Sequence, residues 1–316
     1  MNLKVNSSPH VRGKFTTRSL MLDVVIALIP ALIVGAVVLG VRALLVAAVS
    51  IATAIAAEAL YCVVFKKNIT VMDASAVVTG LLFAMTLPVS VPLWIVAIGS
   101  AFAIFAVKLL CGGLGQNIFN PALLGRAFVM LLFPLALTNY HTDTADAVSG
   151  ATPLHQMVMP ALPQESILDM FLGNCPGSIG EISALALLIG GAYLVIRKVI
   201  SPRIPLAYLG TVAVLALIFH KTDSAFAWML YQLFSGGVML GAIFMATDYV
   251  TSPVTKLGQY IYGVGCGVLT LLFRYFGLFP EGVTYAILLM NLCVWTIDRY
   301  TAGRIYGSTK GGASNA

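Results

Sequence analysis

The stretch that decides the fold is Val77-Val-Thr-Gly-Leu-Leu-Phe-Ala-Met-Thr-Leu-Pro-Val-Ser-Val-Pro92. A shift of 161 residues aligns it with Val238-Met-Leu-Gly-Ala-Ile-Phe-Met-Ala-Thr-Asp-Tyr-Val-Thr-Ser-Pro253. The two stretches share a glycine, a phenylalanine, a threonine and a final proline at the same offsets, and the same shift places Arg42 on Arg203. This pattern predicts two related halves, and the alternative is a chance likeness between apolar helices.

The composition around these stretches indicates a membrane protein. Of the 316 residues, 59% are hydrophobic and only 9% are charged, whereas soluble domains are about 25% charged. Apolar runs long enough to cross a bilayer recur along the whole chain. They predict an all-α integral membrane protein with about ten transmembrane helices, near 20–40, 43–65, 72–88, 93–111, 120–139, 181–198, 205–220, 226–247, 257–277 and 281–298.

The order of these segments predicts the architecture. Five spans in each half put the two halves in opposite orientations, which is the inverted-repeat plan of many transport proteins. Only one connection is long, and it separates the halves. We therefore expect a cytoplasmic N-terminus and first five-helix repeat over 1–139, a long loop over 140–180, and a second repeat with a cytoplasmic tail over 181–316.

The distribution of Lys and Arg predicts the orientation, because these residues favour cytoplasmic loops. With the N-terminus inside, fifteen basic residues, Lys108 and Arg126 among them, fall on the inner side, against three on the outer side, Arg274 among them. Both termini are then cytoplasmic and loop 140–180 is extracytoplasmic. The net charge of +6 follows from this bias, so we predict no nucleic-acid partner.

Two polar groups interrupt the apolar segments and are candidates for ligand binding. In Cys111-Gly-Gly-Leu-Gly-Gln-Asn-Ile-Phe-Asn-Pro-Ala-Leu-Leu-Gly-Arg126, glycines loosen the backbone while Asn117 and Asn120 offer amides. Asn120 before Pro121 is also a good helix start, because Asn caps helices and Pro suits the first turn. The two roles of Asn120 are compatible.

Carboxylates inside apolar segments are costly unless they have a partner, a bound cation or a cavity. Glu58 lies within Ala-Ile-Ala-Ala-Glu58-Ala-Leu, and Asp248 ends the repeated stretch of the second half. Glu58 is therefore the best candidate for a buried functional carboxylate, with Asp248 as a second candidate. The alternative for Glu58 is a hydrogen bond across a helix interface or a contact with another subunit.

The sequence predicts neither a metal site nor a catalytic residue. Its five cysteines contain no CxxC pair and its four histidines do not cluster, whereas zinc sites and iron–sulfur clusters need converging ligands at set spacings.

The long loop contains a motif of small and polar residues, Asp146-Ala-Val-Ser149-Gly150-Ala151-Thr152. The small neighbours leave the Thr152 hydroxyl accessible, but an unaided Thr hydroxyl is a poor nucleophile. Such a residue is better suited to be modified than to catalyse, and the alternative is an ordinary polar turn that ends at Pro153. The motif is similar to the D-x-x-S-G-A-T signature at which a flavin transferase attaches FMN to Thr through a phosphodiester.

The whole chain resembles the RnfD/NqrB family of membrane flavoprotein subunits, which occur in the Rnf ferredoxin–NAD oxidoreductase and in the sodium-pumping NADH–quinone reductase. Gly112-Gly-Leu-Gly-Gln-Asn-Ile-Phe-Asn-Pro-Ala122 is a second matching segment, and only about 19 residues precede the first span, as in the RnfD branch. The resemblance implies covalent FMN on Thr152, with Asp146, Ser149, Gly150 and Ala151 as its recognition residues. It also implies room for a second, non-covalent flavin (riboflavin) between the helices.

The resemblance further implies a place in a larger assembly. The expected partners are RnfA, RnfB, RnfC, RnfE and RnfG, a flavin transferase and membrane lipid, in the inner membrane of a prokaryotic cell. The expected function is that of a translocase subunit, which passes electrons between ferredoxin and NAD coupled to Na⁺ or H⁺ movement. Glu58, with Asp248 as a second candidate, is then expected to couple electron transfer to ion movement. Two other functions stay open: a stand-alone inverted-repeat channel or secondary transporter without a redox cofactor, and a purely structural anchor subunit.

Overall fold

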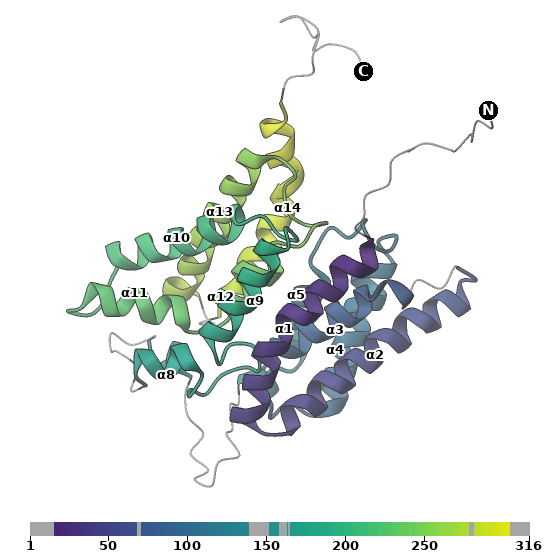
Figure 1. The fold of residues 1–316 in the computed structure, drawn as a ribbon, viewed down its shortest axis with the longest axis horizontal. Helices are drawn as coiled ribbons and strands as arrows, with labels where there is room; N and C mark the ends of the chain where they lie inside the picture. The colour runs from purple at the N-terminus through teal and green to yellow at the C-terminus, as the bar shows by residue number, and fades with distance from the viewer. Residues whose placement is uncertain are drawn as a thin grey trace, which may run out of the picture.

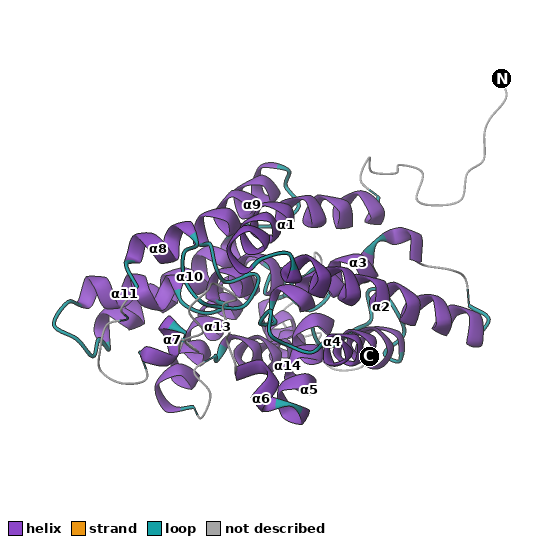
Figure 2. Ribbon diagram, turned by 90° about the horizontal axis from the view of Figure 1, so that it is seen from below, coloured by secondary structure: helices purple, strands orange, loops and turns teal. Residues whose placement is uncertain are grey.

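The computed structural model describes residues 16–67, 71–138, 152–157, 163, 165–277 and 281–303. Throughout these residues the regular elements are helices, with no strand among them (Figure 2). The all-α prediction is therefore confirmed for the part of the chain that is described.

The helices form two groups on either side of the long connection. The first helix group comprises α1 (Thr17–Leu39), α2 (Arg42–Val64), η1 (Val71–Asp73), α3 (Ser75–Met85), α4 (Leu93–Phe102), η2 (Ala103–Leu109), α5 (Pro121–Leu132) and α6 (Pro134–Thr138). The second comprises α9 (Ala184–Ile196), α10 (Arg203–Ile218), α11 (Ala225–Phe234), α12 (Val238–Leu240), η3 (Gly241–Met245), α13 (Lys256–Phe276) and α14 (Val283–Thr301). Two short helices, α7 (Pro153–Gln156) and α8 (Ile167–Leu172), lie in the connection.

Several helix starts follow directly from local sequence. A Ser, Thr or Asn side chain accepts a hydrogen bond from a backbone N–H of the first turn, which satisfies a donor that has no partner within the helix. The caps of this kind include Thr16, Asn120, Ser183 and Thr255. At Asn120 the predicted cap is confirmed, because its Oδ1 accepts from the backbone nitrogen of Ala122 at 3.0 Å.

The segment 226–247, predicted as one span, is bent. Its two parts, α11 and the run from α12 through η3, meet at 64°. Gly236 stands at the break with a φ of +64°, a conformation that glycine adopts without steric cost. At the break, the carbonyls of Gln232 and Ser235 accept hydrogen bonds from Arg274 at 2.6 and 2.7 Å. The break is thus stabilised by a side chain that lies 39 residues or more away.

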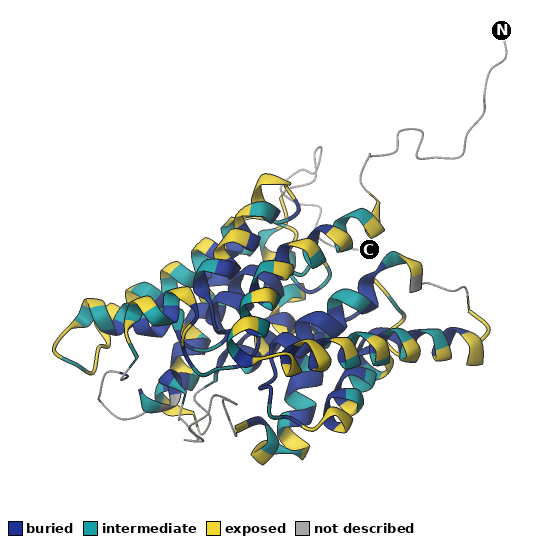
Figure 3. Cartoon of the chain, turned by 60° about the horizontal axis from the view of Figure 1, so that its bottom comes forward, coloured by how far each residue is buried: buried dark blue, intermediate teal, exposed yellow. Residues whose placement is uncertain are grey.

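By length and composition, α1 and α2 are able to cross a membrane, and the bent pair makes a third span if it counts as one. Other apolar helices are shorter, at 10–17 residues. Exposed residues lie along the outer faces of the helices (Figure 3). Many of them are large and apolar, among them Val37, Leu131 and Phe276, which is 85% exposed. Extensive apolar surface is unfavourable in water and expected in lipid, so the helices are those of a membrane-type protein.

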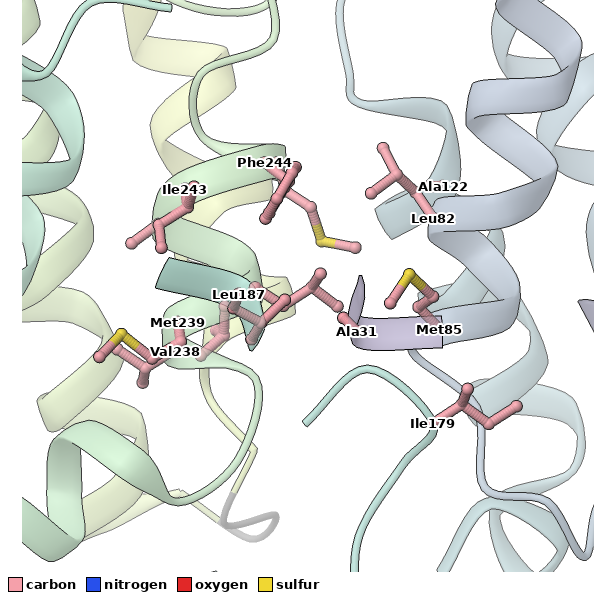
Figure 4. Packing of buried hydrophobic residues seen from close by; sticks show 14 of the residues in the cluster. Ala31, Leu82, Met85, Ala122, Ile179, Leu187, Val238, Met239, Ile243 and Phe244 are labelled. Atoms are coloured by element: carbon pink, nitrogen blue, oxygen red, sulfur yellow. The ribbon is translucent and has the colours of Figure 1, made fainter. Parts of the chain in front are cut away.

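The two groups meet along α1 and α9, which pack side by side (Figure 1), and again where α5 contacts α14. Side chains from both groups fill this boundary, including Ala31, Met85, Leu187 and Phe244 (Figure 4). The backbones of α1 and α9 approach closely at Gly190, where a Cβ would lie only 2.1 Å from the carbonyl oxygen of Ala27. Close approach of this kind through small residues is typical of helix pairs in membranes.

Candidate functional site

A cavity of about 340 Å³ lies at the boundary between the two helix groups. We call it the central cavity. Residues of α1, α3, η2 and α5 line one side of it, and residues of α9, η3 and the following turn line the other. Most of the lining is apolar, and the polar groups include Thr79, Lys108, Asn117, Asn120, Thr247 and Asp248. An apolar cavity with a few convergent polar groups is the usual form of a small-molecule site.

The two predicted asparagines line this cavity together. Asn120 is 3% exposed, and besides capping α5 its Nδ2 donates to the carbonyl of Met245 at 3.2 Å. Its amide therefore links the two helix groups. Asn117 is also buried, and its Nδ2 donates to the carbonyl of Phe119 at 3.0 Å. Both amides are positioned by the turn that precedes α5.

Asp248 reaches the same cavity from the second helix group. It follows η3, a π-helical segment, and its Oδ2 accepts a hydrogen bond from Thr251 at 3.1 Å. Next to it, the hydroxyl of Thr247 donates to the carbonyl of Ile243 at 2.6 Å. The structure thus brings Asn117, Asn120 and Asp248 together, although Asp248 is far from the asparagines in sequence.

Glu58 is fully buried but does not line the central cavity. Its Oε1 is 2.9 Å from Nζ of Lys108, and the same Nζ donates to the Ser75 hydroxyl at 2.7 Å. Ser75 in turn donates to Asp73 Oδ1 at 2.8 Å. Lys108 belongs to η2, the π-helical continuation of α4, and lines the central cavity. The partner that burial of Glu58 requires is therefore a lysine 50 residues further on.

A second cavity, which we call the vestibule, lies on the other side of this ion pair. It measures about 530 Å³ and is lined by Glu58, Tyr61, Cys62, Lys66, Lys67, Leu109 and the Gly112–Leu114 turn. Lys67 Nζ donates to the Tyr61 hydroxyl at 3.1 Å, and that hydroxyl donates to the carbonyl of Leu109 at 3.3 Å. The exposed lysines Lys66 and Lys67 mark the outer end of the vestibule, and Glu58 marks the inner end.

Thr152 lies elsewhere, at the start of α7. It is partly buried and lines a small crevice together with Cys175, Gly236, Glu181 and Glu281. Asp146, Ser149, Gly150 and Ala151, the rest of the predicted modification motif, lie outside the described residues. The threonine and the asparagines predicted to bind flavin therefore belong to two separate sites.

Beside this crevice, Arg126 of α5 forms ion pairs with two carboxylates. It contacts Glu281 directly, and its guanidinium lies 3.8 Å from Glu181 Oε1. That oxygen is buried and has no hydrogen-bond partner among the described residues. The ion pairs join α5 to the segments that precede α9 and α14.

Three of the basic residues counted for the orientation are buried. Lys108 and Arg126, of the predicted inner set, and Arg274, of the predicted outer set, are 2%, 8% and 7% exposed, so they do not lie in exposed loops. Each is buried because carboxylates, a hydroxyl or carbonyls surround its charge. Sequence reasoning missed them as site residues. Their one available signal was an isolated basic residue in an apolar run.

The fold and the central cavity thus define an all-helical, membrane-type protein with a polar-lined site between two helix groups. Among the described residues, no three His, Cys, Asp or Glu side chains converge as metal ligands would. Residues 4–307 match the model of the NQR2, RnfD, RnfE family. Because the match spans nearly the whole sequence, the chain belongs to this family.

Individual relatives are similar over almost their full length. The chain is 49% identical to the D component of the Na⁺-translocating ferredoxin:NAD⁺ oxidoreductase complex of Acetobacterium woodii, over 98% of this chain and 97% of that protein. It is 42% identical to the D component of the proton-translocating ferredoxin:NAD⁺ oxidoreductase complex of Clostridium ljungdahlii, over 97% and 96%. Identity to the D component of the ion-translocating oxidoreductase complex of Stutzerimonas stutzeri is 37%, over 91% of each chain.

Proposed function

We propose that this chain is a membrane flavoprotein subunit of an ion-translocating ferredoxin:NAD⁺ oxidoreductase complex of the Rnf type. The observation that carries the proposal is the 49% identity to such a subunit over 98% of the chain. The relatives' names also imply partner subunits, which would deliver and remove electrons. Co-purification of a tagged chain from native membranes tests this. The proposal expects ferredoxin-dependent NAD⁺ reduction in the purified assembly, and a chain isolated alone from its host would contradict it.

We further propose that the central cavity holds a non-covalent flavin. Its volume of about 340 Å³ lies in the range of about 300–1,000 Å³ usual for small-ligand sites. The amides of Asn117 and Asn120 and the Lys108 ammonium offer donors and acceptors that suit the polar edge of a flavin ring, and the apolar walls suit its faces. A bound flavin would supply one- and two-electron transfer, while the chain supplies position and electrostatics.

Flavin that is released by acid from the purified complex tests this assignment. Replacing Asn117 with Leu removes a cavity amide, and we expect the releasable flavin to fall at least tenfold. Gln116→Leu is the matched control, because Gln116 is exposed and does not line the cavity. Equal flavin content in both variants would show that the cavity is not the binding site.

Thr152 is proposed to carry FMN through a phosphodiester. Support comes from the sequence motif and from the position of Thr152 at the edge of a crevice at the start of α7. The acids of that crevice would repel a phosphate dianion. Esterification removes one of the two charges, and Arg126 compensates part of the acidic charge nearby.

Mass spectrometry of the peptide around Thr152 tests the attachment. The FMN mass should be present in the wild type and absent in Thr152→Ala, whereas Thr138→Ala, outside the motif, should keep it. An unmodified wild-type peptide from a host with an active flavin transferase would contradict the proposal.

The predicted inverted repeat and orientation are also retained as proposals, with 1–139 and 181–316 as the two repeats. The shift of 161 residues relates α1 to α9 and α5 to α14, and these are the pairs that meet at the boundary between the helix groups. Contact between equivalent elements is what a two-fold relation produces. In Figure 1 the start of α1 and the end of α14 lie in the upper half, and α8 lies in the lower half.

Cysteine labelling in intact cells tests the orientation. A cysteine introduced between residues 140 and 170 should react with an impermeant thiol reagent, whereas one beside Lys66 should not. The reverse pattern would place the flavin-bearing loop in the cytoplasm.

The second candidate function is a channel or secondary transporter without a redox cofactor, which the bent helix pair and the central cavity favour. Flavin fluorescence of the denatured subunit in a gel separates the two functions, because only the flavoprotein fluoresces. Redox-driven ion uptake by vesicles that contain the complex, with and without Na⁺, then distinguishes Na⁺ from H⁺. Parallel measurements on Asp248→Asn test that carboxylate as a coupling group.

A further inference from the structure

The ion pair between Glu58 and Lys108 lies between the two cavities. Lys108 lines the central cavity and Glu58 lines the vestibule, and their charged atoms are 2.9 Å apart. Leu114, which is 40% exposed, also lines both cavities. The hydrogen bond between Lys108 and Glu58 connects the two spaces through side chains that are almost completely buried.

Stability does not account for such a pair. Desolvation of two charges offsets much of their attraction, and replacing a buried ion pair by apolar residues is often neutral or stabilising. Here a carboxylate and an ammonium are both buried within apolar helices, at 0% and 2% exposure. The ammonium is held by a third partner, Ser75, which itself donates to Asp73. The arrangement is what a proton pathway requires: titratable groups in hydrogen-bond contact, each open to a different space.

We propose that Glu58 and Lys108 form a proton relay from the vestibule into the central cavity. The inference rests on the proposed function, because it requires a redox ligand in that cavity. When an electron from the partner subunits enters the cavity, Lys108 Nζ gives one proton to the reduced ligand. Glu58 takes one proton from water in the vestibule and passes it across the 2.9 Å contact to the neutral amine of Lys108. The net result is one electron and one proton added in the cavity and one proton removed from the vestibule.

Charge and geometry set the direction of the relay. An added electron raises the proton affinity of the reduced ligand in the central cavity, which favours transfer of a proton to it from the Lys108 ammonium. On the vestibule side, the proton must pass a wall that contains two exposed lysines, which disfavours metal cations far more than neutral water. Among the described residues, the other titratable groups that face the pair or line the two cavities are Tyr61, Cys62, Lys66, Lys67, Asp73, Asp248 and Tyr249.

The test measures proton uptake and flavin reduction together in the purified complex after rapid reduction, with a pH-indicator dye. In the wild type we expect one proton per electron. Glu58→Gln should slow proton uptake at least tenfold while electron arrival stays unchanged. Asp23→Asn is the matched control: it removes another buried carboxylate that is paired with a basic residue, Arg197, outside both cavities.

A redox titration gives a second readout that does not depend on turnover. In the wild type the midpoint potential of the releasable flavin should fall by about 59 mV per pH unit, the one-electron equivalent of a tenfold change in proton activity. Lys108→Met should keep this slope, because the slope counts protons per electron at equilibrium, but it should slow proton uptake after rapid reduction at least tenfold, because the route is lost. Because Lys108→Met leaves the Glu58 carboxylate without its cation, the double variant Glu58→Gln/Lys108→Met, which carries neither charge, provides a folded version for the same measurements.

The outcomes separate this inference from the proposed function. Absence of releasable flavin from wild-type complex would overturn both. Full flavin occupancy with a wild-type rate of proton uptake in Glu58→Gln or in the double variant would overturn the relay alone. Slow uptake in Asp23→Asn as well would show that the effect is structural and would also overturn it.

Discussion

The close contact between α1 and α9 offers a sharp test of the packing between the two helix groups. At Gly190 an added Cβ would lie 2.1 Å from the Ala27 carbonyl oxygen and 3.0 Å from its carbonyl carbon. These are backbone atoms, so no side-chain rotation relieves the clash. In Gly190→Ala, helices α1 and α9 must therefore move apart by about 1 Å to restore an ordinary non-bonded contact.

The magnitude follows from two opposing terms. Overpacking of a tight interface costs about 1–3 kcal/mol, whereas replacing a helical Gly by Ala gains about 1 kcal/mol or less. Gly190→Ala should therefore be destabilised. Gly210→Ala is the matched control, because Gly210 is exposed within α10 and no atom lies within 4 Å of its added Cβ. That variant keeps the propensity gain without the clash.

Thermal unfolding in detergent, followed by intrinsic fluorescence, measures both variants. We expect a lower midpoint for Gly190→Ala than for the wild type, and an equal or higher midpoint for Gly210→Ala. Since α1 and α9 both contribute to the central cavity, Gly190→Ala should also retain less releasable flavin. A midpoint for Gly190→Ala at or above that of Gly210→Ala would refute the argument that these helices are in backbone contact.

Three further predictions concern other parts of the molecule. Burial, reinforced by nearby carboxylates, raises the pKa of the Cys175 thiol to about 12. Because the thiolate is the reactive form, a thiol reagent at neutral pH should label Cys175 at least 100-fold more slowly than the exposed Cys111. Similar labelling rates would contradict the burial of Cys175. Arg126→Met removes the cation that is paired with the buried Glu181 and the partly buried Glu281, and breaking a buried pair costs about 3–5 kcal/mol of unfolding free energy. Arg126→Lys should cost less, and an unchanged unfolding midpoint in the methionine variant would count against the pair. Asn120→Ala loses a helix cap worth about 1 kcal/mol and the hydrogen bond from Asn120 to the Met245 carbonyl between the helix groups. Asn120→Asp keeps the cap acceptor, so its unfolding midpoint should lie between those of the wild type and the alanine variant.

Local sequence was sufficient for much of the fold. Helix positions follow from apolar runs and from caps such as Asn120, because both depend on residues within a turn or two of each other. The interruption of the chain around Asn117 was also visible, because glycines and amides stand out against an apolar background. The same holds for the motif that ends at Thr152, although most of it lies outside the described residues.

The sequence by itself thus determined the helical class, the apolar surface and the family, since these depend on composition, periodicity and motif. Only the tertiary structure decided which polar groups meet. Lys108 pairs with a glutamate 50 residues away, and Arg274 holds carbonyls at the break of another helix. A basic residue in a linear pattern looks the same whether it faces the cytoplasm or a buried carboxylate. The difference lies in desolvation and in partners supplied by other helices, and both exist only once the helices have packed.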